Sequence, residues 1–293
     1  MVTMAFTTQL EYEVLDASCD FIFNIEAART PRQKVVAESL VISQPLQANQ
    51  GLDASTQSRS FSLQALQGKL GIRYEATVEL THYEASFDTL YELSPHSLPG
   101  NVLPYLYPSR YCQSDRLMAF TGQQFGGMNM GYSRVQAIRD WVFNNVRFQG
   151  NTSNSNTSAI DTLIERVGVC RDFAHLMIAL CRAANLPARM VSGMDYGADP
   201  ALGPPDFHAY VEVYLADASG AGRWYMFDPS GTAIPMGFVR FCTGRDAADI
   251  AFATIFGNVI AAQPIISIQA VADSNGNLVL PQHVSFALST DSA

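Results

Sequence analysis

The hydrophobic residues of this chain change their spacing about a third of the way along its 293 residues. Before residue 95, short apolar or alternating segments such as "FTTQLEYEVLD" and "CDFIFNIEAA" are separated by Gln, Asn, Gly and Ser, as in strands joined by turns. From Arg116 onward, apolar residues recur with the helical period, and alternating segments return later in the chain. The sequence therefore predicts an α+β protein with an all-β module at its N-terminus.

The predicted organisation has three parts. Residues 1–95 form an N-terminal β domain, which we expect to be sandwich-like because many short strands at regular spacing are typical of that architecture. Residues 96–262 form the core that carries the helices, and a proline-rich connection leads into it. Residues 263–293 form a C-terminal tail that packs on one of the other parts, and Asn275-Gly276 predicts a β-hairpin within it.

The chain is acidic, with a formal net charge of −9 at pH 7. We expect no nucleic-acid partner, because phosphate binding requires a basic surface. No segment approaches the ~18 consecutive apolar residues of a transmembrane helix, and the N-terminus lacks the basic and apolar regions of a signal peptide. The sequence therefore predicts a cytoplasmic protein without a membrane partner, and it does not indicate an oligomeric state.

The cysteines of the chain are scattered, and none forms a C-x-x-C pair. Their odd number and wide spacing favour reduced thiols over a disulfide framework. The same spacing disfavours a structural zinc site, whose ligands usually occur in closely spaced pairs, so we expect no metal. The cysteines are Cys19, Cys112, Cys170, Cys181 and Cys242.

Cys170 stands at the start of a predicted amphipathic helix. The residues at 170, 173, 174, 177, 178 and 181 fall on one stripe, and Pro187 prevents the helix from continuing. The free N–H groups and partial positive charge of a helix N-terminus favour a thiolate, so Cys170 is a candidate nucleophile, with an inert core thiol as the alternative. Cys181 lies deeper on the stripe and is interpreted as inert. His175 lies about 140° around the helix from Cys170 and is interpreted as structural.

A predicted β-hairpin supplies a better-placed histidine. In "DFHAYVEVYL" the odd-numbered positions are apolar, which puts His208 on the opposite face of the strand. If Leu215 pairs with Ala221, His208 stands directly opposite Asp228 of the next strand, with Cβ atoms ~4.5–5.5 Å apart. A slip of one residue would put the two side chains on different faces of the sheet.

Cys170, His208 and Asp228 together fit a catalytic triad, because a thiolate nucleophile needs a general base and a group that orients this base. A chance coincidence of scattered residues is the alternative. The backbone N–H of Cys170 is a candidate donor to an oxyanion. The pattern does not identify a second donor among three residues that are more simply interpreted as core or loop: Trp141, Gln149 and Trp224.

Several segments around these residues carry further predictions. "SAID" at 158–161 fits a capping box that opens a short helix before Cys170, and Ser133 is the candidate N-cap of an earlier helix. Asp172 suits the first turn of the Cys170 helix as a capping residue. The loop 195–206 is a candidate border of a substrate groove, and three residues on the face of His208 are candidates for lining the cleft: Tyr210, Glu212 and Tyr214.

The segments "GVCRDFAH", "DFHAYVEVYL" and "WYMFDPSG" resemble the three signatures of the transglutaminase-like superfamily. The resemblance is strong over about residues 100–260, and bacterial members also carry an N-terminal β domain. It implies a papain-like α+β core in which the nucleophile is Cys170, the base His208 and the acid Asp228. It further implies a thioester acyl-enzyme formed on a protein or peptide substrate, with no cofactor.

Three functions follow as hypotheses. The first is a thiol-dependent amide-bond hydrolase of the cysteine-peptidase type. The second is a transglutaminase or amine acyltransferase, which shares the acyl-enzyme and differs in whether water or an amine resolves it. The third is a non-catalytic protein-binding scaffold, which has no physical need for an intact set of Cys, His and Asp.

Overall fold

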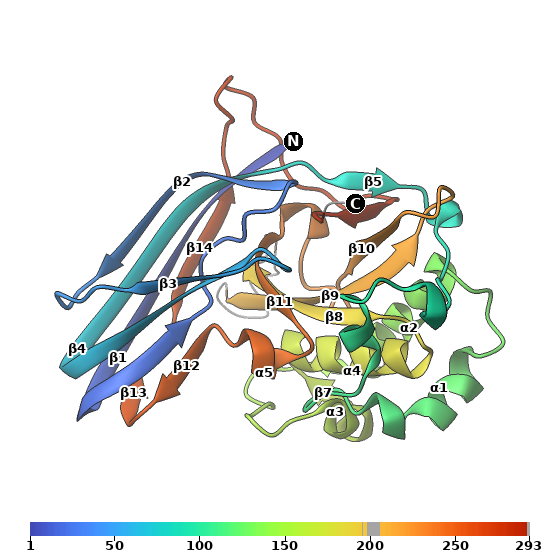
Figure 1. The fold of residues 1–293 in the computed structure, drawn as a ribbon, viewed down its shortest axis with the longest axis horizontal. Helices are drawn as coiled ribbons and strands as arrows, with labels where there is room; N and C mark the ends of the chain where they lie inside the picture. Colours follow the sequence, from blue (N-terminus) through green and yellow to red (C-terminus); the bar gives the residue numbers. More distant parts are fainter. Residues whose placement is uncertain (195, 198–205, 292–293) are drawn as a thin grey trace.

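The chain folds into a β-rich part and a mixed part that lie side by side (Figure 1). The structure is a computed structural model, and it describes residues 1–194, 196–197 and 206–291. In the first part long strands run along one side of the molecule, and in the second a smaller sheet lies over a group of helices (Figure 1). The α+β fold class and the N-terminal β domain predicted from the sequence are confirmed.

Two long antiparallel strands, β1 (Val2–Phe23) and β4 (Ser58–Leu80), form the centre of the N-terminal sheet. Along the free edge of β4 the strands β2 (Gln33–Ile42) and β3 (Asn49–Asp53) pair with it. Along the free edge of β1 lie three strands from near the C-terminus: β12 (Ala253–Phe256), β13 (Val259–Ala261) and β14 (Ile265–Ala270).

The N-terminal sheet bends back on itself at a bulge in β1 between Val14 and Ser18. Tyr12 and Phe21 are nine positions apart, which would separate them by ~30 Å in a straight strand, yet their ring centroids lie 5.2 Å apart. Before the bulge the even-numbered residues of β1 are buried and after it the odd-numbered ones are, so one apolar face stays inside through the bend. Two layers of a single sheet thereby enclose one core, which accounts for the sandwich-like character of the domain.

The mixed part is built on an antiparallel sheet with the strand order β10-β9-β8-β11. Helix α4 (Cys170–Ala183) is buried over most of its length between this sheet and the other helices. The strands are β8 (Ala188–Met194), β9 (Phe207–Ala216), β10 (Gly222–Phe227) and β11 (Val239–Gly244). The helices around α4 are α1 (Met118–Phe125), α2 (Tyr132–Asn145) and α3 (Ala159–Glu165).

Short elements complete the chain. The proline-rich connection forms four 3₁₀ turns, and their bounds are Phe87–Thr89, Pro95–Ser97, Leu103–Leu106 and Ser114–Arg116. The remaining elements are β5 (Tyr83–Ala85), β6 (Arg147–Phe148), β7 (Val167–Gly168), a 3₁₀ turn at Pro235–Gly237, α5 (Ala247–Ile250) and β15 (Ala287–Ser289). Within the described ranges, no helix has the length and apolar character needed to cross a membrane.

The two parts of the molecule are joined through strand β11. The side-chain amide of Gln33 donates to Arg240 O at 2.7 Å and accepts from Arg240 N–H at 2.8 Å, and Ala28 N–H donates to the same carbonyl. Val239 and Phe241, which flank Arg240, point into the core of the N-terminal sheet. The strand therefore belongs to one sheet while its Val239 and Phe241 side chains fill the core of the other.

The C-terminal prediction differs from the structure. Residues 253–261, expected in the helical core, form strands on the edge of the N-terminal sheet, because the long strand β1 leaves that edge open for pairing. At Asn275-Gly276, where a β-hairpin was predicted, the turn forms: Gly276 N–H donates to Asp273 O at 3.0 Å and Asp273 N–H donates to Asn277 O at 2.9 Å. The pairing ends there, because residues 271–281 contain no strand. Strand β14 pairs with β1, and β15 pairs with β5.

Candidate active site

Cys170 is the first residue of α4, and the residues around it fix where the helix starts. The carboxylate of Asp172 accepts a hydrogen bond from Val169 N–H at 2.9 Å and another from Ser153 Oγ at 2.9 Å. A Cβ on Gly168 would lie 2.7 Å from Asp172 Cβ, so only glycine allows this close approach. The capping role predicted for Asp172 is therefore confirmed, and so is the helix that was predicted to begin at Cys170.

Cys170 differs from the other cysteines in its exposure. It is partly exposed, whereas Cys19, Cys112, Cys181 and Cys242 are buried. Burial raises the pKa of the Cys112 thiol to about 12 and that of Cys242 to about 11, and it also raises the pKa of Cys181. The interpretation of Cys181 as an inert core thiol agrees with this, and Cys170 is the cysteine that a substrate can reach.

Strand β9 carries His208 to Cys170. The Sγ atom of Cys170 lies 3.9 Å from Phe207 O, which places the sulfur at the start of β9. The imidazole of the next residue, His208, lies close enough to Cys170 for the thiol to help raise the pKa of the ring. On its other side, His208 Nε2 lies 3.4 Å from Asp228 Oδ1. The structure thus brings the three predicted residues together in the order thiol, imidazole, carboxylate.

The pairing of β9 with β10 is shifted by two residues from the predicted register. Leu215 pairs with Arg223 instead of Ala221, because the turn before β10 is wider than assumed. In this turn Asp217 accepts hydrogen bonds from Ser219 and forms an ion pair with Arg223. A shift of two keeps the alternation of faces. His208 and Asp228 therefore share a face as predicted, but they meet diagonally and not directly across the ladder.

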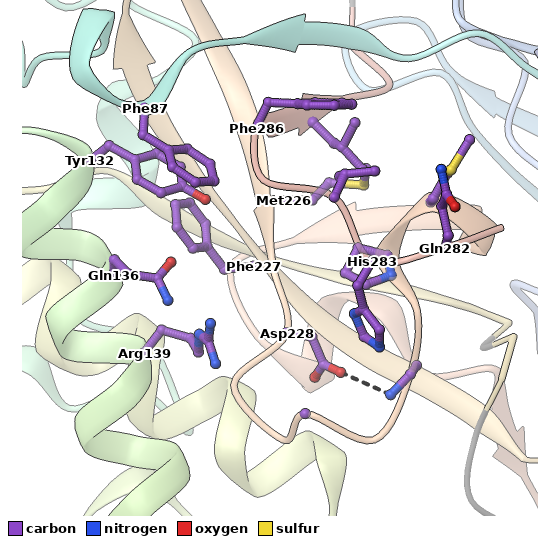
Figure 2. A pocket seen from close by; sticks show the side chains of 16 residues that line it. Phe87, Tyr132, Gln136, Arg139, Met226, Phe227, Asp228, Gln282, His283 and Phe286 are labelled. Atoms are coloured by element: carbon purple, nitrogen blue, oxygen red, sulfur yellow. Dashed lines mark hydrogen bonds between the residues drawn. The ribbon is translucent and has the colours of Figure 1, made fainter.

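Asp228 follows the last ladder pair of β10, and a tight turn fixes its carboxylate. Ser230 donates to Oδ1 from its N–H at 3.0 Å and from its Oγ at 2.6 Å. Ala233 N–H donates to Oδ2 at 3.2 Å (Figure 2). These donors and His208 occupy both oxygens, so the carboxylate has one orientation toward the imidazole.

The charges of His208 and Asp228 stabilise each other. Burial by itself lowers the pKa of His208, but the charge of Asp228, its hydrogen bond and the contact with Cys170 raise that pKa well above its usual value. Burial likewise raises the pKa of Asp228, but the nearby His208 and the bonds from Ser230 and Ala233 bring it below its usual value. The site therefore favours a protonated imidazole beside an ionised carboxylate.

His175 has the structural role predicted for it. It is fully buried, its Nε2 accepts a hydrogen bond from Ala247 N–H at 3.2 Å, and its ring stacks on Tyr111 at 5.0 Å. Burial lowers its pKa to about 3, so the ring is neutral at physiological pH. The capping box of α3 is also present, since Asp161 accepts from Ser158 N–H at 2.9 Å. Helix α2, however, begins at Tyr132 and not after Ser133.

The candidates for a second oxyanion donor lie in different places. Trp141 packs edge-on against Phe120 and beneath Arg166, and Trp224 lies under Arg189, so both indoles belong to packed cores. Gln149 is exposed, and its backbone N–H donates to Gly168 O at 2.9 Å, two residues before Cys170. Gln149 is therefore the candidate whose backbone the structure places beside the start of α4.

Of the three residues predicted to line the cleft beside His208, Tyr214 lines a separate pocket together with Arg189 and Trp224, and the other two are packed inside the protein. Tyr210 stacks on Phe238 at 4.3 Å and is buried. Glu212 is also buried and pairs with Arg189, which in turn binds Asp291 near the C-terminus. Sequence reasoning missed this cluster, because an arginine inside a strand gives no signal about a partner about 100 residues away. The predicted groove loop 195–206 lies, apart from residues 196, 197 and 206, outside the described residues.

Chemically, the arrangement offers a reachable thiol, a buried imidazole and a fixed carboxylate. Among the residues that the structure describes, no cluster of three or more His, Cys, Asp or Glu side chains has the geometry to hold a metal ion. A thiol at the start of a central helix that faces histidine on an antiparallel sheet is the arrangement of papain-like cysteine enzymes. The fold and the site together define a papain-like enzyme.

Comparison with known protein families supports the same class of enzyme. The model of the transglutaminase-like superfamily matches residues 119–229, and the model of the bacterial transglutaminase N-terminal domain matches residues 3–94. A crystal structure described as a "Putative Cysteine Protease" from Cytophaga hutchinsonii is 37% identical, with a TM-score of 0.88 over 98% of this chain and 97% of that chain. This chain belongs to the transglutaminase-like superfamily, as its motifs predicted.

Two bacterial relatives are similar over smaller parts of this chain. An uncharacterized protein of Mycobacterium leprae is 26% identical over 66% of this chain and 69% of its own length. An uncharacterized protein of Mycobacterium tuberculosis is 30% identical over 40% of this chain and 40% of its own length. The chain thus covers about two fifths of the second relative's length.

Proposed function

We propose that this protein is a thiol-dependent amide-bond hydrolase that acts on a protein or peptide through Cys170, His208 and Asp228. The observation that supports it is the position of His208, in contact with the partly exposed thiol on one side and with Asp228 at 3.4 Å on the other. A scaffold would have no reason to retain a buried histidine whose pKa is raised beside a reachable cysteine.

In the first half-reaction, Cys170 Sγ attacks the carbonyl carbon of the amide, and the carbonyl electron pair moves onto oxygen. The backbone N–H of Cys170, in the first turn of α4, would donate to this oxyanion. The imidazolium of His208 then gives its proton to the leaving nitrogen as the C–N bond breaks. The products are a thioester on Cys170 and a free amine.

In the second half-reaction, neutral His208 takes a proton from water, whose oxygen attacks the thioester carbonyl. The C–S bond breaks, the acid product leaves, and the thiolate and imidazolium are restored. Asp228 keeps its charge throughout, because it accepts hydrogen bonds from Ser230 and Ala233 in addition to facing His208. Its part is to orient the imidazole and to stabilise the imidazolium.

Alkylation with iodoacetamide between about pH 5 and pH 9 tests the thiol, since the thiolate is the reactive form. Mass spectrometry should find the label on Cys170 in the wild type and no comparable label in Cys170→Ala. The variant His208→Gln should be alkylated more slowly at the acid end of the range. Equal labelling in Cys170→Ala, or labelling mainly at another cysteine, would remove the basis of the proposal.

A transglutaminase or amine acyltransferase is the alternative, supported by the superfamily to which the chain belongs. The two reactions are separated by incubating dimethylcasein with the protein, with and without the fluorescent amine dansylcadaverine. Hydrolysis produces new termini or converted glutamine side chains whether or not the amine is present. Transfer produces casein that carries the dansyl group, and neither product should form with Cys170→Ala.

A further inference from the structure

A cavity of about 430 Å³ has Asp228 of the candidate triad in its wall (Figure 2). Five stretches of chain line it: the 3₁₀ turn at Phe87–Thr89, helix α2, the end of β10, the loop 231–236 and the C-terminal segment 282–288. Neither Cys170 nor His208 lines it. A volume of this size falls within the range of small-molecule sites, which combine apolar walls with a few converging polar groups.

The walls of the cavity are mainly apolar. Phe87 stacks on Tyr132 at 4.4 Å, and Tyr132 packs on Phe227 at 5.0 Å, so three aromatic rings form one wall (Figure 2). Met226 and Phe286 belong to the opposite side. Such a lining would accept the apolar body of a ligand and take its surface out of water.

Polar groups gather at one end of the cavity. Tyr132, Gln136 and Arg139 lie on one face of α2, at spacings of four and three residues. Figure 2 shows Gln136 and Arg139 extending from the helix toward the cavity, with His283 across from them. Arginine presents a planar fork of donors that matches a carboxylate, so Arg139 suits an anionic head group. The charge of Asp228 in the same wall is met by His208 and by hydrogen bonds from Ser230 and Ala233.

Arg139 is available for such a head group. Among the described residues its ion-pair partner is Asp140, which it meets through one terminal nitrogen, Nη1, at 3.2 Å. The Arg139 side chain is 29% exposed and the Asp140 side chain about half exposed. Water therefore screens this ion pair, and the pair contributes little to stability. A ligand carboxylate in the cavity would find the remaining donors of the guanidinium without breaking a strong contact.

We propose that this cavity is a second binding site, for a small ligand that carries a carboxylate on an apolar or aromatic body. The carboxylate binds Arg139, with Gln136 and His283 beside it, and the apolar body lies against the rings of Phe87, Tyr132 and Phe227. The ligand is either a free small molecule or the C-terminus of a peptide that ends in an apolar residue. Because Asp228 forms part of the cavity wall, the site adjoins the candidate triad while remaining separate from the thiol.

Calorimetric titration with 3-phenylpropionate tests the proposal on the intact chain. We expect a dissociation constant of about 1 mM or tighter, within the ordinary binding efficiency of so small a ligand. The neutral analogue 3-phenylpropanamide has the same shape and should bind at least about tenfold more weakly, because it cannot accept the charge-assisted bonds of Arg139. Peptides ending in phenylalanine, with a free or an amidated C-terminus, determine which source of carboxylate fits.

Two variants and one modification complete the test. Arg139→Gln should weaken 3-phenylpropionate about tenfold or more, whereas Arg147→Gln, which changes an exposed arginine outside the cavity, should not. Protein alkylated at Cys170 should bind the ligand unchanged, so the result does not depend on the proposed hydrolase activity. Equal binding of acid and amide, equal binding by both arginine variants, loss of binding on alkylation, or no binding at millimolar ligand would each overturn the proposal.

Discussion

Replacing Glu212 by glutamine should destabilise the protein by about 3 kcal/mol, because it breaks a buried ion pair. Glu212 Oε2 accepts a hydrogen bond from Arg189 Nε at 2.7 Å and lies 2.6 Å from Arg189 Nη2 in the ion pair. The two side chains are 0% and 4% exposed. Removing one partner of such a pair costs about 3–5 kcal/mol. Asp291 stays bound to Arg189 at 2.6 Å, which places the expected loss at the lower end of this range.

Urea unfolding of the intact chain measures this loss, with Glu75→Gln as the matched control. Glu75 pairs with Arg73 on the surface, where both side chains are about half exposed, so the control should change the free energy of unfolding by less than about 1 kcal/mol. The double variant Glu212→Leu with Arg189→Met removes both buried charges and should be more stable than Glu212→Gln. A loss below about 1 kcal/mol for Glu212→Gln, or a double variant that is less stable still, would refute the reasoning.

Three further predictions concern the site. Asp228→Asn should lower turnover of dimethylcasein roughly 10²–10⁴-fold, since the imidazole loses its orienting charge, and an unchanged rate would contradict this role. The pKa of His208 is raised in the folded protein, so its protonation stabilises the fold fully below the ordinary value of 6.5 and less as pH rises through the folded-state pKa. The stability difference between wild type and His208→Gln in urea should accordingly shrink with increasing pH, and a difference that grows would count against it. Gly168→Ala should slow alkylation of Cys170 by up to about 100-fold. The new methyl group would lie 2.7 Å from Asp172 Cβ and displace this residue. An alkylation rate equal to that of the wild type would show that the start of α4 tolerates the methyl group.

The sequence predicts best where one local pattern determines the result. The start of α4 at Cys170 follows from the apolar stripe and from Asp172 in the first turn, and both are present. The split of β9 into an apolar face and a face carrying His208 follows from simple alternation, and the apolar face does pack on α4. Such features depend on neighbours a few positions apart, so no knowledge of the distant chain is needed.

Features that depend on distant partners were not predictable in this way. The strands at 253–270 look like many other apolar segments, and their place beside β1 depends on which edge the rest of the fold leaves open. The ion pairs of Arg189 join residues 23 and 102 positions apart. A single sequence has no signal for either, because hydrophobic period and turn chemistry describe local geometry only.

The two-residue error in the hairpin register shows why the candidate triad could still be predicted. Turn residues decide how far one strand slides along another, and the Asp217 turn made this distance longer than assumed. Alternation of side chains decides which face a residue takes, and it is unaffected by a slide of two positions. A hydrogen bond between His208 and Asp228 requires a shared face and a short diagonal, which an imidazole can span in more than one register. The alternation of side chains was therefore enough to predict that His208 and Asp228 belong to one site. The turn between β9 and β10 determines how far apart they lie along the strands.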